Sequence, residues 1–85
     1  MKKIGSDKPF GSSALQRISI GDLVEWAVLE TDEDKNWYER KAQGILIDIV
    51  IEEFGGREVY FGEVIPLKNQ ITCRVFLYLL ERVTI

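Results

Sequence analysis

The sequence predicts an all-β fold, a small antiparallel barrel of five strands. Three observations predict it: short apolar segments alternate with period two, a glycine pair separates the two longest of them, and 85 residues have room for one domain. A flat sheet of this size would leave one apolar face in water. Closing the sheet buries that face and removes most of its edge strands, so a barrel is expected.

The longest predicted element is a β-hairpin over residues 44–66. Its turn is expected at the pair Gly55 and Gly56. Gly44 and Gly62 are expected where the strands bend. Isoleucines at alternate positions of the first strand predict one aliphatic face turned toward the core, formed by Ile45, Ile47, Ile49 and Ile51.

The segments on either side of the hairpin complete the predicted barrel. Residues 23–29 predict a strand buried on much of both faces, with Trp26 in the core. Residues 71–80 predict another strand, with Cys73 on its aliphatic face as a buried structural thiol rather than a nucleophile. Residues 81–85 are expected to close the sheet as a short edge strand.

The first 17 residues are expected to form a flexible basic N-terminal arm, and residues 18–85 the barrel domain. The arm is rich in glycine and serine and shows no apolar periodicity. It carries a formal charge of +3, whereas the remainder of the chain carries −6. The arm either reaches an acidic or phosphate-bearing partner or is a soluble terminus. The second interpretation is favoured because short basic tails are common.

The polar segment over residues 30–41 is expected to be a charged loop. Asp32, Asp34 and Asn36 have the opening spacing of an EF-hand calcium loop. The sixth position, where such a loop needs glycine, is Trp37, and the twelfth, where it needs glutamate, is Gln43. Calcium binding is therefore not expected.

Two aromatic residues in this acidic segment indicate a contact site. Trp37 and Tyr38 either fold back over the end of the core or remain exposed, and the sequence leaves both arrangements open. Exposed aromatic side chains mark protein contacts. The predicted partner-binding residues are Asp32, Asp34, Trp37, Tyr38 and Arg40.

The composition disfavours catalysis. The chain has no histidine, which removes Ser-His and Cys-His nucleophile pairs, histidine zinc sites and the commonest general base. Single carboxylates such as Asp48 and Glu63 specify no reaction, and Asp48 is expected to face solvent. We therefore expect no enzyme, no catalytic residue, no metal and no cofactor.

Nucleic-acid binding is the alternative function. A net charge of −3 disfavours it, because non-specific binding depends on attraction to phosphate. A basic groove would need scattered cations to converge, namely Arg40, Lys41, Arg57, Arg74 and Arg82. A single cysteine fits a reducing compartment and no apolar run approaches the ~20 residues of a membrane span, so we expect a cytoplasmic location and no membrane contact. Exposed edge strands allow a homodimer.

The order of these segments resembles a known class of small barrels. The likeness is carried by IGDLVEW, GILIDI, GGREVYFGEVI and the closing VFLYLLERV, and it covers about residues 18–85. This chain resembles small Src-homology-3-like barrel proteins of unknown function encoded by tailed phages, including cyanophages. The resemblance implies a phage origin, with the host cytoplasm or the virion as the location. From the charged segment and its two aromatic residues we expect a non-enzymatic protein-interaction module, whose partner would then be a host or phage protein. Its acidic segment lacks the tyrosine pair that proline-motif-binding domains use, so that ligand is not expected.

Overall fold

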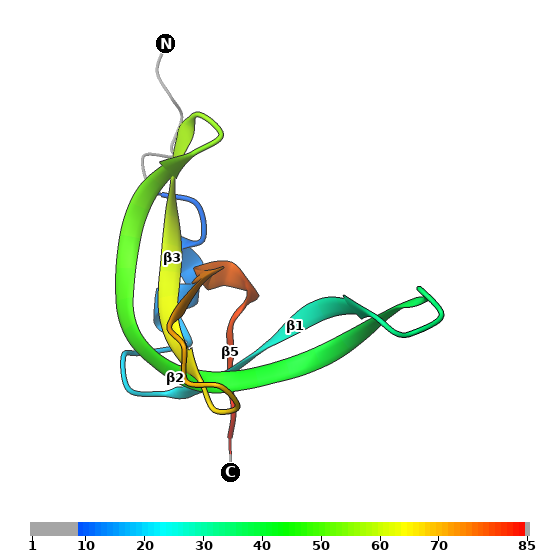
Figure 1. Cartoon of the computed structure of the whole chain (residues 1–85). Coiled ribbons are helices and arrows are strands. Elements are labelled where there is room, and N and C mark those ends of the chain that lie inside the picture. Colours follow the sequence, from blue (N-terminus) through cyan, green and yellow to red (C-terminus); the bar gives the residue numbers. More distant parts are fainter. Residues whose placement is uncertain (1–8, 85) are drawn as a thin grey trace.

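The computed structural model describes residues 9–84, which form one antiparallel sheet of five strands in the order β4-β3-β2-β1-β5 (Figure 1). The strands and the two short 3-10 helices are β1 (Leu23–Thr31), β2 (Trp37–Phe54), β3 (Arg57–Pro66), β4 (Cys73–Phe76), β5 (Glu81–Arg82), η1 (Ser12–Gln16) and η2 (Leu77–Leu79). The all-β class and the five antiparallel strands are confirmed. The closed barrel is not formed, because β4 and β5 are the two edges of an open sheet.

Strand β2 is long and is shared by two hairpins. Its first part pairs with β1 from Thr31↔Trp37 to Leu23↔Ile45, and its second part pairs with β3. Figure 1 shows β2 curving sharply between these parts, so that the β1–β2 hairpin projects away from the remaining strands. The resulting molecule is elongated, with extents of 51 × 31 × 21 Å.

The hairpin predicted over residues 44–66 is confirmed. Strands β2 and β3 pair from Gly44↔Pro66 to Phe54↔Arg57. Both turn residues have positive φ, 66° at Gly55 and 88° at Gly56, which is the backbone that tight hairpin turns require and that glycine adopts without strain.

The predicted aliphatic core face of β2 is wrong. The register shifts between Leu46 and Asp48, which is a β-bulge that moves the alternation by one residue. Leu46 is completely buried, whereas Ile47 and Ile51 are exposed. Ile49, which follows the bulge in the sequence, packs against the core.

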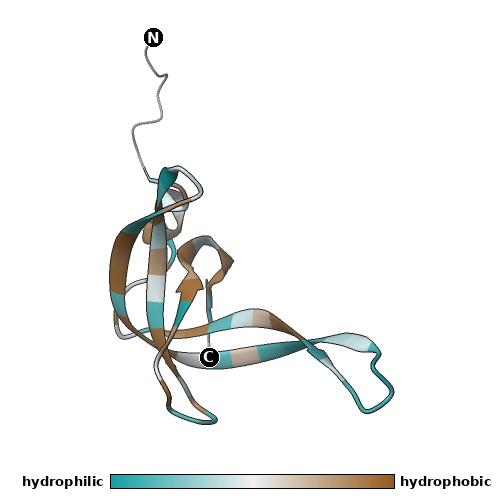
Figure 2. Ribbon diagram, turned by 45° about the horizontal axis from the view of Figure 1, so that its top comes forward, coloured by the Kyte–Doolittle hydropathy of each residue, from teal (hydrophilic) through white to brown (hydrophobic). Residues whose placement is uncertain are grey.

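The core lies where β2 bends and is formed by buried residues of η1, β1, β2, β3 and η2 and of the segments beside them: Ala14, Ile18, Val24, Trp26, Leu46, Val64, Leu77 and Leu80. Trp26 is buried, as predicted. Figure 2 shows that hydrophobic residues concentrate around this bend, while the far end of the β1–β2 hairpin is hydrophilic. Apolar burial therefore stabilises one end of the sheet and not the other.

Two glycines are needed because other parts of the chain approach them closely. A Cβ atom on Gly44 would lie 2.5 Å from the backbone oxygen of Ile65. A Cβ atom on Gly62 would lie 2.8 to 3.2 Å from the side-chain ends of three core leucines. Gly44 pairs with both β1 and β3, so it lies at the junction of the two hairpins.

The strand predicted over residues 71–80 is shorter than expected. Strand β4 ends at Phe76, and the 3-10 helix η2 follows it. Leu77 and Leu80 both reach the core because residues three apart share one side of a 3-10 turn. The prediction that Cys73 is buried is wrong, because Cys73 lies at the exposed start of β4.

Residues 9–17, expected to belong to a flexible arm, pack against the sheet. Phe10 forms a parallel bridge with Val59, and Ala14 in η1 is completely buried. The Arg17 guanidinium donates to the backbone oxygen of Leu80 at 3.0 Å. Residues 1–8 of the expected arm lie outside the described residues.

Candidate functional site

The projecting end of the β1–β2 hairpin, residues 27–41, is the candidate site, and we call it the ribbon. Strand β5 pairs with β1 only at Val24 and Glu25, and β3 pairs with β2 only from Gly44 onward. Within the ribbon each strand therefore has a single neighbouring strand among residues 9–84. A two-stranded ribbon has little capacity to bury apolar surface. Neither of its edges has a further strand among these residues, and Val28 at its base packs against the core.

The segment predicted as a loop over residues 30–41 is mostly strand. The pairing continues to Thr31↔Trp37, and only residues 32–36 form the turn. Composition alone suggested a loop because the segment is charged, but a solvated ribbon tolerates charged residues on both faces. The predicted partner-binding residues are therefore held on a regular two-stranded framework.

Asp32 organises the turn. Its Oδ1 atom accepts the backbone N–H groups of Asp34 at 2.9 Å and Asn36 at 3.0 Å. Lys35 has a φ of 66° in the same turn. Asp34 lies on the exposed turn with Thr31, Asp32 and Glu33 around a shallow hollow. The role that the geometry gives Asp32 is to fix the turn, since its Oδ1 atom accepts two backbone N–H groups of the turn.

The face of the ribbon that continues from the buried Trp26 is the inner face, and the opposite one is the outer face. The inner face carries a polar cluster. Glu30 lies opposite Tyr38 in the register, and its carboxylate accepts the Tyr38 hydroxyl at 2.9 Å and the Arg40 guanidinium at 2.7 Å. The Arg40 hydrogen bond, followed by that of Tyr38, lowers the pKa of Glu30 below its ordinary value. The same contact raises the pKa of Tyr38. Tyr38 and Arg40 thus come together through Glu30, which the sequence did not single out.

The outer face of the ribbon carries an apolar pair near the tip. The side chain of Trp37 is 70% exposed and that of Leu29 is 67% exposed. Their positions in the register place Trp37 diagonally across from Leu29, within reach of an indole ring. The expectation that residues 23–29 are buried on both faces is therefore wrong at Leu29, and the open question about Trp37 is resolved in favour of exposure.

Beside this pair, the outer face is polar toward the body of the molecule. Glu25 accepts hydrogen bonds from Lys41 at 3.2 Å and Gln43 at 3.1 Å. The Gln43 bond and then the Lys41 bond lower the pKa of Glu25. The apolar pair is thus bounded on one side by neutralised charges and on the other by the acidic turn.

A hollow of about 630 Å³ lies between the inner side of the β1–β2 hairpin and the connection from β3 to β4. Four cations line it, together with Trp26 and the Cys73 side chain: Arg40, Lys41, Lys68 and Arg74. Three of these cations have glutamate partners, because Arg74 is held between Glu52 and Glu63 in the same way that Glu30 holds Arg40 and Glu25 holds Lys41. Most of the positive charge is therefore balanced inside the protein.

The five cations considered for a basic groove only partly converge. Arg57 lies over the Phe10 ring, 5.2 Å from its centroid, and Arg82 lies beside Arg17 at another surface. The two carboxylates considered for catalysis, Asp48 and Glu63, are opposite each other in the β2–β3 register but have separate polar partners. Asp48 is exposed, as predicted, and accepts its neighbour's N–H, while Glu63 is paired with Arg74. Partial burial raises the pKa of the Cys73 thiol, which disfavours the nucleophilic thiolate.

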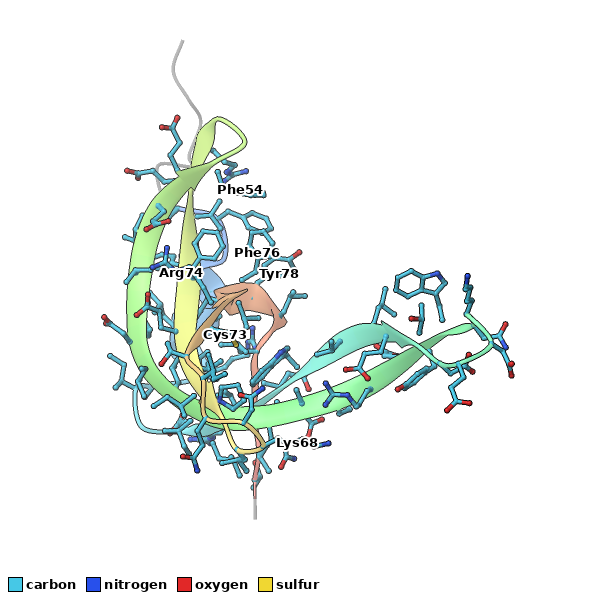
Figure 3. All side chains as sticks on the ribbon, in the orientation of Figure 1. Phe54, Lys68, Cys73, Arg74, Phe76 and Tyr78 are labelled. Atoms are coloured by element: carbon cyan, nitrogen blue, oxygen red, sulfur yellow. The ribbon has the colours of Figure 1, made fainter. Side chains whose placement is uncertain are left out.

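Sequence reasoning missed an aromatic cluster beside the β2–β3 turn. Phe54, Phe61 and Phe76 contact one another with ring centroids 5.0 to 6.2 Å apart, and Tyr78 links Phe76 to Phe10. Figure 3 shows Phe54, Phe76 and Tyr78 together on the inner side of the curved β2. These rings come from separate segments of the chain, so no local sequence pattern predicts that they contact one another.

In comparisons with known proteins, no family model, no curated protein and no solved structure matches this chain. The resemblance to tailed-phage proteins therefore stays a prediction. Within residues 9–84, no helix is long and apolar enough to cross a membrane.

Proposed function

We propose that this chain is a non-enzymatic protein-interaction module whose contact surface is the ribbon. The observation that carries the proposal is the exposure of Trp37 and Leu29 on the same face of a projecting element. Large aromatic residues supply much of the binding energy at protein interfaces when a partner desolvates them. Tyr38 and Arg40, which belong to residue types enriched at such interfaces, lie on the opposite face of the same element.

The surroundings of Trp37 support a protein partner. The indole is flanked by apolar Leu29 and by the acidic turn, so the surface offers an apolar centre with a polar rim. The turn is rigidified by the Asp32 carboxylate, which reduces the ordering needed on binding. The complementary partner would present an apolar pocket bordered by basic groups.

The proposal also includes a Src-homology-3-like fold class and a tailed-phage origin for this chain. An open five-stranded antiparallel sheet whose strand β2 bends at one core supports a Src-homology-3-like class. The sequence resemblance supports a tailed-phage origin, with a host or phage protein as partner in the host cytoplasm or the virion.

Immobilised protein tests the proposal by capturing a partner from a lysate of the native host. Wild type is compared with Trp37→Ala and with Ile71→Ala, which removes a side chain of equal exposure, 70%, outside the ribbon. We expect the same partner, other than the chain itself, with wild type and Ile71→Ala and its loss with Trp37→Ala at unchanged melting temperature. Equal capture by Trp37→Ala would remove the ribbon as the contact.

Nucleic-acid binding is the second candidate, and the cation-lined hollow is the observation that favours it. Lys68 forms no ion pair within residues 9–84 and lines the hollow with three paired cations. A groove for nucleic acid would show salt-sensitive binding to a single-stranded oligonucleotide that weakens in Lys68→Ala. Binding that is lost in Lys68→Ala and kept in Trp37→Ala would favour this candidate over the first.

A further inference from the structure

The outer edge of β1 in the ribbon is an uncovered strand edge. The Val83 N–H donates to the Leu23 oxygen at 2.9 Å, so the backbone groups of Leu23 point toward the β5 side. Backbone direction alternates along a strand, and the N–H and C=O groups of Ala27, Leu29 and Thr31 therefore point out of the same edge. Strand β5 ends its pairing with β1 at Glu25 and leaves those groups open.

This edge lacks the usual protection against strand pairing. Edge strands are commonly blocked by lysine, proline, a bulge or charges directed along the edge. Residues 26–31 read WAVLET and contain one charge, Glu30, which is already bound by Tyr38 and Arg40. The opposite edge of the ribbon is different, because its residues 37–41 read WYERK and present three charges.

We infer that the β1 edge pairs antiparallel with the same edge of a second copy of the chain, with the two-fold axis at Leu29. The inference rests on the proposed role of the ribbon as a contact surface and names one partner for it. The pairing would join two β1–β2 ribbons into a four-stranded sheet.

The register follows from what the structure allows. An axis at Leu29 pairs Ala27 with Thr31 of the second copy on both sides of a Leu29 pair, and all three outward-pointing residues find hydrogen-bonding partners. An axis at Val28 would set Thr31 against Glu25, whose edge β5 already occupies. An axis at Glu30 would place two carboxylates directly opposite each other, which is unfavourable.

The side chains fit the register centred on Leu29. The two Leu29 side chains, each 67% exposed in one chain, would cover each other. Glu30 would face Val28 of the second copy, so no like charges would stand opposite. Because the ribbon projects from the body (Figure 1), the two bodies would lie at opposite ends of the joined sheet.

Analytical ultracentrifugation over a range of protein concentrations tests the inference. We expect wild type to dimerise, Leu29→Lys to dimerise at least about tenfold more weakly, a difference of about 1.4 kcal/mol, and Ile71→Lys to behave as wild type. Ile71→Lys makes the same charge change at an exposed apolar residue outside the ribbon. A wild-type monomer at every concentration, or an unaffected Leu29→Lys dimer, would overturn the inference.

Disulfide trapping tests the register without depending on the stability of Leu29→Lys. In a Cys73→Ser background, which removes the exposed native thiol, Leu29→Cys should form a covalent dimer rapidly under a mild oxidant. Paired Cα atoms at such a site lie about 5.5 Å apart, within the range of a disulfide. Ala27→Cys should remain monomeric under the same oxidant. Equal trapping of both variants would overturn the register.

These outcomes separate the inference from the proposed function. A monomeric wild type that still loses its captured partner in Trp37→Ala would refute the self-pairing and leave the proposed function standing. A Leu29-dependent dimer with partner capture unaffected by Trp37→Ala would refute the proposed function and leave the self-pairing standing.

Discussion

The two halves of β2 are both antiparallel strand, but one contributes buried side chains to the core and the other presents exposed side chains to solvent. At and beyond the bend, β2 pairs with β3 and contributes side chains to the core, and Leu46 is fully buried there. Before the bend, in the ribbon, β2 pairs with β1 and presents Trp37 to solvent. Hydrophobic burial stabilises the half at and beyond the bend, and exposed cross-strand polar contacts hold the ribbon half.

This contrast indicates that stability and contact are separated along one strand. Substitutions in the body should act on folding, because side chains there are packed against many others. Substitutions on the ribbon should act on binding, because its side chains meet solvent in the single chain. The following variants test that separation in order of expected effect.

The largest loss of stability is expected for Leu46→Ala. Removing a completely buried leucine next to Leu77 and Leu80 leaves a cavity and should lower the free energy of unfolding by about 3 kcal/mol. Urea denaturation measures the change. Leu29→Ala is the matched control and should lie within about 0.5 kcal/mol of wild type. Similar losses in both variants would contradict the separation.

A smaller loss is expected for Gly44→Ala, at the junction of the two hairpins. The new Cβ atom would meet a backbone oxygen at 2.5 Å, so two strands must move apart, and a cost of about 2 kcal/mol is expected. Gly62→Ala meets the ends of leucine side chains, which can rotate away, and should cost less in the same denaturation experiment. A larger loss of stability in Gly62→Ala than in Gly44→Ala would show that the backbone contact at Gly44 is not the tighter of the two.

The ribbon should loosen as the pH falls. The pKa of Glu30 is lowered from its ordinary value of 4.5, so its contribution is present above that value and is lost as pH falls through the lower folded pKa. An NMR titration should show this lowered pKa. Arg40→Gln should raise the pKa of Glu30 more than Tyr38→Phe, and Lys41→Gln should leave it unchanged while raising that of Glu25. A Glu30 pKa that ignores Arg40→Gln would contradict the assigned contact.

The smallest effect on stability is expected for Trp37→Ala. Because the side chain is largely exposed, the free energy of unfolding should change by no more than about 0.5 kcal/mol, as measured by thermal denaturation. A loss several times larger would mean that Trp37 supports the fold rather than a contact.

The sequence predicts the parts of the fold that depend on neighbouring residues. The hairpin over residues 44–66 follows from alternation and from Gly55 and Gly56, whose positive φ a turn requires. Trp26 follows from its place in an alternating apolar strand. These features need no knowledge of distant segments.

The sequence fails where distant parts of the chain decide the outcome. The bulge after Leu46 moves the core face by one residue, while the run of isoleucines suggested an unbroken strand. The 3-10 turn at η2 brings Leu77 and Leu80 into the core, whereas the alternation predicted for a strand places them on opposite faces. In the candidate site, composition indicated Trp37 and Tyr38, but their exposure depends on where β3 and β5 stop pairing.

Amide hydrogen exchange along β2 in dilute, monomeric protein tests the central claim most directly. Residues 44–46, where β2 is buried at the bend, should exchange only when the whole domain unfolds, whereas residues 38–41 in the ribbon should exchange through local opening at a lower free energy. Equal protection in both segments, at the free energy of global unfolding, would contradict the division of β2 into a folding half and a contact half.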